Sequence, residues 1–101
     1  MTIQQAAQQA LDIQDDCNLS GVVFAFERCM RAVCDDSQAR GTGTKERNQH
    51  PIVTMFLLKL CELNGCGSTL NPAYEEAERT CKEIAACSGT GSCVWCDASK
   101  G

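Results

Sequence analysis

The chain has 101 residues, a formal net charge of −4 and nine cysteines. This length suits a single domain, which can bury a hydrophobic core without covalent cross-links. The excess of Asp and Glu over Lys and Arg argues against nucleic acid or an anionic membrane surface as the main partner, and an odd number of cysteines cannot all pair within one chain.

The first predicted helix begins at Thr2, because Thr2 and Gln5 have the spacing of a capping box. Apolar residues then recur at helical intervals until the pattern stops around Asp15 and Asp16. The ten residues at the start carry neither the basic region nor the apolar region of a signal peptide, and no apolar run is long enough to span a membrane. We therefore expect a cytoplasmic protein whose thiols are mostly reduced.

A second helix is predicted from the N-cap residue Asn18, and its pattern fades after residues 34–36. The two acidic pairs, 15–16 and 35–36, are interpreted as solvated helix ends. The predicted apolar face of this helix consists of Leu19, Val22, Val23, Phe26, Met30 and Val33.

Two further helices are each predicted to begin at a proline, because proline fits the first turn of a helix. The third follows a polar connection at residues 40–49, opens at 50–51 and ends at 64–65. Its apolar stripe is so wide that we expect it to be the most buried helix. The fourth opens at 71–72, and its predicted stripe is Tyr74, Ala77, Cys81 and Ile84.

These patterns predict an all-α fold, a small bundle of four helices over residues 1–87. Residues 88–101 form a turn-rich tail that contains cysteine and glycine and is not an independent domain. Trp95 in this tail either anchors it to the bundle or contacts a partner.

Four cysteines near the C-terminus are the candidate metal ligands: Cys81, Cys87, Cys93 and Cys96. The last two have the Cys-x2-Cys spacing that forms half of a structural zinc site. On one continuous helix, Cys81 and Cys87 point roughly 240° apart, so Cys87 has to lie beyond the helix end for both to bind one ion. Cys66 is the alternative fourth ligand.

The same Cys-x2-Cys spacing occurs in thiol–disulfide oxidoreductases, but there it opens a helix after a strand, a context that this sequence lacks. Cys29 and Cys61 lie on apolar stripes and are predicted to pack in the core. The only histidine, His50, precedes Pro51 and is interpreted as a helix cap or a solvent-exposed residue. We find no nucleophile–base motif and expect no enzymatic activity.

Two segments, residues 16–23 and 48–52, resemble paired signatures of small uncharacterised proteins that phages and other mobile elements encode. The resemblance spans roughly residues 10–65, omits the tail and carries no known activity. It implies an accessory protein in the cytoplasm of a host cell.

Three functions are left open. The leading hypothesis is a non-enzymatic helical protein that binds another protein, such as a host factor, without a cofactor, and that can form homo-oligomers. The alternative is a small module in which the C-terminal cysteines bind zinc. The third is a redox enzyme, which requires an accessible thiol with a lowered pKa.

Overall fold

The computed structural model describes residues 1–41, 49–65 and 70–87. Within these residues the chain is all-α, as predicted. The helices are α1 (Ile3–Asp12), α2 (Leu19–Arg40), α4 (Pro51–Leu63) and α5 (Pro72–Ala86), and a single 3-10 turn, η1 (Ile13–Asp15), prolongs α1. No described helix is both long enough and apolar enough to cross a membrane.

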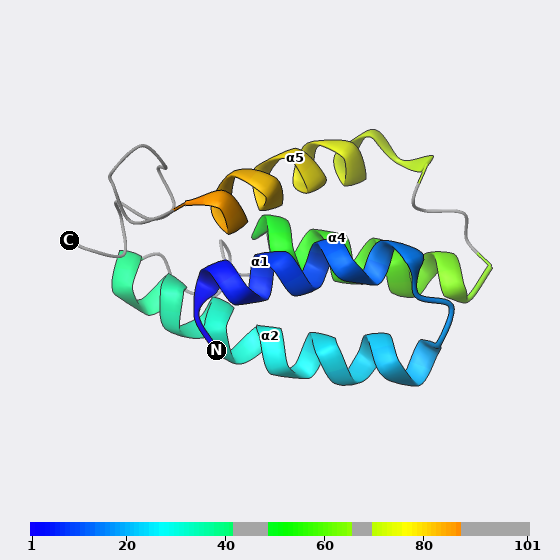
Figure 1. Cartoon of the computed structure of the whole chain (residues 1–101), viewed down its shortest axis with the longest axis horizontal. Helices are drawn as coiled ribbons and strands as arrows, with labels where there is room; N and C mark the ends of the chain where they lie inside the picture. Colours follow the sequence, from blue (N-terminus) through cyan, green and yellow to red (C-terminus); the bar gives the residue numbers. More distant parts are fainter. Residues whose placement is uncertain (42–48, 66–69, 88–101) are drawn as a thin grey trace.

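The four helices lie side by side, and successive helices run in opposite directions (Figure 1). Extensive contacts join α1 to α2, α2 to α4, α4 to α5 and α5 back to α1, so the first and last helices are neighbours and close the bundle. This arrangement is an up-down-up-down bundle, in which each helix buries one face against its neighbours.

Side chains cap the start of each helix, and this explains where the helices begin. At α1, the N–H of Gln5 donates to Thr2 Oγ1 (3.1 Å) while the N–H of Thr2 donates to Gln5 Oε1 (2.9 Å), which confirms the predicted capping box. Asn18, His50 and Asn71 cap the other three helices through their side chains, as predicted. Each cap satisfies N–H groups that have no partner within their own helix.

The predicted end of the second helix was wrong. Instead of fading at residues 34–36, α2 continues to Arg40 and ends at Gly41, whose φ of 71° is left-handed. Asp36 and Ser37 are buried in this last part, so Asp36 is not a solvated helix end. Polar residues are usually exposed to solvent. Two adjacent polar residues that end an apolar pattern are therefore easily mistaken for the end of a helix, even when they are buried.

The centre of the core is made by α4, of which only Leu57 is exposed, so the prediction that this helix is the most buried is confirmed. Phe56 is fully buried and stacks on Phe26 of α2, with 5.3 Å between ring centroids. The predicted stripe of the fourth helix is also confirmed, since all four of its residues are buried in α5.

The buried face of α2 is rotated relative to the prediction. Val22 and Val33 are buried as expected, but Leu19 and Val23 are exposed, and small residues take their place in the core: Ala25, Cys29 and Ala32. A helix of small residues can approach α1 closely, because α1 also faces the core with alanines.

One lysine lies inside the bundle, where the sequence suggested only apolar side chains. Lys59 of α4 is buried, its Nζ donates to the main-chain oxygen of Gln14 (3.0 Å), and it lies 3.2 Å from Glu62 Oε2. The ammonium group thus binds a carbonyl of η1. It fixes the end of the first helical segment against α4.

Candidate functional site

The four cysteines predicted as metal ligands are only partly within the described residues. Cys81 is fully buried in the face of α5 that packs in the core. Cys87 caps the C-terminus of α5 and therefore lies beyond the helix end, as the zinc hypothesis requires, but it is disulfide-bonded. Cys93 and Cys96 lie outside the described residues. Among residues 1–41, 49–65 and 70–87, no three His, Cys, Asp or Glu side chains are grouped closely enough to hold a metal ion.

The zinc site therefore stays a prediction. A disulfide-bonded sulfur is not a thiolate, so zinc binding through Cys87 requires that this bond be reduced first. Metal content and intact mass, measured with and without reductant, test the prediction directly.

Cys29 and Cys81 are buried thiols with suppressed acidity. Burial, with smaller contributions from the nearby Cys29 and Glu78, raises the pKa of Cys81 to about 12. Burial also raises the pKa of Cys29 to about 11, against the opposing effect of Arg28. The predicted core position of Cys29 is confirmed, whereas Cys61 is half-buried and does not belong to the buried core. Neither Cys29 nor Cys81 has the lowered pKa that a redox or nucleophilic cysteine needs.

We expect Cys29 and Cys81 to resist alkylation in the folded protein. The rise from 9.0 to about 12 lowers the thiolate fraction of Cys81 roughly a thousandfold at pH 8, and burial blocks access to what remains. Time-resolved iodoacetamide labelling read by peptide mass spectrometry should therefore show that Cys17, which is exposed, reacts before Cys29 and Cys81. Equal rates at Cys17 and Cys81 would contradict this assignment.

The same shifts predict how stability depends on pH. The folded state holds the protons of Cys29 and Cys81 more tightly than the unfolded chain, so this contribution is complete below pH 9 and is lost as the pH rises toward 11 and 12. Urea denaturation at pH 8 and pH 10.5 measures the loss, and a Cys29→Ala, Cys81→Ala double variant should show a smaller dependence.

His50 has a structural role that explains its burial. Its Nδ1 accepts a hydrogen bond from the N–H of Ile52 (3.2 Å), and its Nε2 lies 3.4 Å from Asp36 Oδ2. Because Nδ1 is an acceptor, a neutral ring carries its proton on Nε2, toward Asp36. The predicted role as a helix cap is confirmed, and the alternative of a solvent-exposed position is wrong, because His50 is buried. The ring also joins α4 to the C-terminal part of α2.

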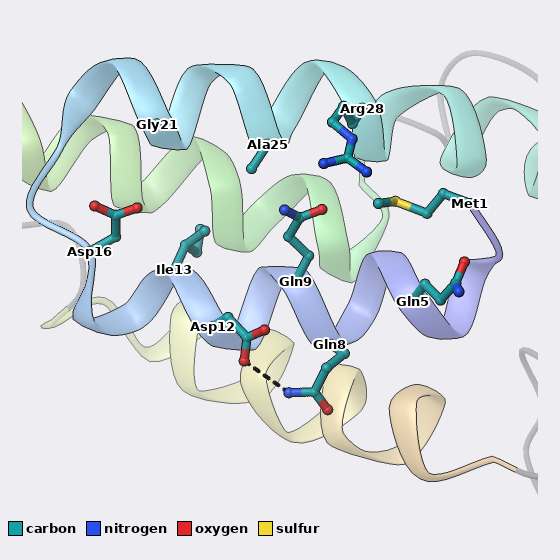
Figure 2. A pocket seen from close by; sticks show the side chains of 10 residues that line it. All are labelled: Met1, Gln5, Gln8, Gln9, Asp12, Ile13, Asp16, Gly21, Ala25 and Arg28. Carbon is teal, nitrogen blue, oxygen red and sulfur yellow. Dashed lines mark hydrogen bonds between the residues drawn. The ribbon is translucent and has the colours of Figure 1, made fainter.

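An open hollow with a volume of about 570 Å³ lies between α1 and α2 (Figure 2). Gly21 and Ala25 of α2 and Ile13 of η1 line it, because their small or inward-facing side chains leave space between the two helices. Gly21 approaches the turn before α2 closely, since a Cβ placed on it would lie 3.4 Å from Asp16 Oδ2. Asp16 and Arg28 stand at opposite ends of this hollow in Figure 2.

Beside this hollow, the surface of α2 presents large exposed side chains. Phe24 is 62% exposed and Met1 is 50% exposed, and both line a second hollow of about 360 Å³ that also includes Arg31. Arg28 borders both hollows and lies over the Phe24 ring, with its Cζ 5.8 Å from the ring centroid. Met1 is held in place by Cys29, whose Sγ lies 3.8 Å from its sulfur. We call this surface of α1 and α2, with its two hollows, the α1–α2 face.

The sequence interpretation missed the α1–α2 face. One signal was present: Phe24 lies outside the predicted apolar stripe of its helix, so the periodicity places a large apolar side chain at the surface. The hollow itself could not be found this way, since it depends on how closely α1 and α2 pack.

Comparison with models of protein families, with curated proteins and with solved structures gives no match. The physical properties of the site are therefore the basis for the functional conclusion.

Proposed function

We propose that this protein is a non-enzymatic interaction protein that binds a protein partner through the α1–α2 face. The observation that carries the proposal is the combination of Phe24, Met1 and Arg28 around two adjoining hollows. Aromatic residues, methionine and arginine are enriched at protein interfaces, where a few of them supply most of the binding energy.

Burial of the Phe24 side chain against a partner would contribute favourably to the free energy of binding. Full burial of a phenylalanine side chain is worth about 1.5–3 kcal/mol relative to exposure, and the core gains none of this from Phe24. The nearby hollow offers a partner side chain a floor of small residues. Arg28 can hold a partner group by charge while its stem packs on the aromatic ring.

The resemblance to proteins of phages and mobile elements fits an intracellular accessory role, which we include in the proposal. Residues 16–23 contain the Asn18 cap of α2, and residues 48–52 contain the His50 cap of α4. These two segments therefore support the fold, while the partner would be selected by side chains outside them, such as Phe24 and Arg28.

Site-specific photo-crosslinking tests the proposal. A photoreactive phenylalanine analogue at position 24, expressed in cells, should form a covalent adduct with a protein, and Arg28→Glu in the same chain should weaken this adduct. The matched control carries the analogue at Glu83, an exposed residue of α5. Adduct patterns that are identical at positions 24 and 83 would exclude the α1–α2 face as the binding surface.

A further inference from the structure

We infer that the partner which the α1–α2 face fits is a second copy of this chain, paired across a two-fold axis. The inference rests on the proposed function, because it assigns an occupant to the same face. Two independent properties of the face, its shape and its charge, are each complementary to themselves.

The shape argument concerns a projecting side chain and a hollow on one helix. Phe24 projects from α2, while Gly21 and Ala25, three residues before and one after it, line the hollow next to it. A two-fold axis perpendicular to α2 and passing near Phe24 places two α2 helices antiparallel across the interface. Each Phe24 then enters the partner's hollow, so one symmetric contact is made twice.

The charge argument uses the two ends of the hollow. Asp16 lies beside Gly21 at one end and Arg28 lies at the other (Figure 2). Gly21 and Arg28 are seven residues apart, which is roughly 10 Å along the helix axis. The same axis brings the Arg28 of one copy against the partner's Asp16, and the second pair forms by symmetry. A parallel arrangement would not form these pairs, so the charges also select the direction.

The amide-rich side of the face is compatible with this pairing. Gln5, Gln8 and Gln9 line the hollow along α1. Amide groups can donate and accept hydrogen bonds, so they can meet identical groups of the partner without the repulsion that equal charges would cause. The chain has a net charge of −4, and physiological salt screens the overall repulsion between two copies more than it weakens contacts at the interface.

Sedimentation equilibrium across a range of protein concentrations tests the pairing. The wild-type chain should form a dimer, and Phe24→Ser should raise the dissociation constant by at least about tenfold. Leu57→Ser is the matched control, because Leu57 is also a large apolar residue, 49% exposed, but lies on α4. It should leave the dimer unchanged. Circular dichroism verifies that both variants are folded.

A charge exchange tests the pairing of Arg28 with Asp16. Arg28→Glu and Asp16→Lys each place like charges together in a symmetric dimer, so each variant alone should be monomeric. In an equimolar mixture, one copy of each variant restores an attractive pair at both positions, and a mixed dimer should appear. Native mass spectrometry identifies it by mass.

The outcomes separate this inference from the proposed function. A wild-type chain that remains monomeric at several hundred micromolar overturns the inference, as does a dimer that Phe24→Ser and the charge variants do not weaken. If the photoreactive group at position 24 then forms an adduct with a different protein, the proposed function stands and only the identity of the partner is wrong. Absence of both dimer and adduct overturns both.

Discussion

Replacing His50 with alanine is expected to lower the free energy of unfolding by about 2–4 kcal/mol, the sum of a lost helix cap and a lost buried polar contact. The change removes the cap that accepts the N–H of Ile52 and also removes the ring that faces the buried carboxylate of Asp36. Loss of this buried contact adds to the loss of the cap, because water does not easily replace a contact made by a buried polar group. Urea denaturation followed by circular dichroism at 222 nm measures the effect.

Two variants divide this effect into its parts. His50→Asn retains a good capping residue and should lose only the contact with Asp36, so it should be the milder change. Asn71→Ala is the matched control, since Asn71 also caps a helix before a proline but is exposed, and it should cost about 1 kcal/mol. A loss at His50→Ala no greater than that at Asn71→Ala would mean that the contact with Asp36 contributes no stability.

Replacing each of the three phenylalanines with alanine should lower the free energy of unfolding by very different amounts. Phe56 is fully buried, so Phe56→Ala is expected to cost about 3–5 kcal/mol through lost apolar burial and the cavity that remains. Phe26 stacks on Phe56 but is only half-buried, so Phe26→Ala should lower the free energy of unfolding by less than Phe56→Ala does. Phe24→Ala should change stability by less than about 0.5 kcal/mol.

Thermal and urea denaturation at low protein concentration provide the measurement, because any dimer is then dissociated and does not contribute to stability. Phe24→Ala then serves as the internal control, on the same helix and two residues from Phe26. A cost at Phe24 comparable to that at Phe56 would contradict the burial that separates the two residues.

The sequence predicted most of the fold because its signals were local. The Thr2–Gln5 capping box, the capping residues before each later helix and the two proline starts depend only on neighbouring residues, and all are confirmed. The narrow stripe of α5 was also correct, because its apolar and charged residues alternate at one clear period.

Features that depend on tertiary contacts were missed. Asp36 and Lys59 were not recognised as buried, because each is stabilised by a group distant in the sequence, His50 and Gln14 respectively. The rotation of α2 was missed for a related reason. Periodicity identifies an apolar side but gives small residues little weight, and close packing against α1 favours Ala25 over Leu19.

The contact between α1 and α5 has a consequence for how the chain folds as it is made. The most extensive helix–helix contact in the described structure joins the first helix to the last. During synthesis α1 leaves the ribosome before α5, so its most extensive packing surface is not complete until residue 86 has emerged. The helices α2 and α4 can pair earlier, around Phe26 and Phe56. We therefore expect the nascent chain to remain sensitive to protease at α1 until α5 is complete, and then to become protected in a single step.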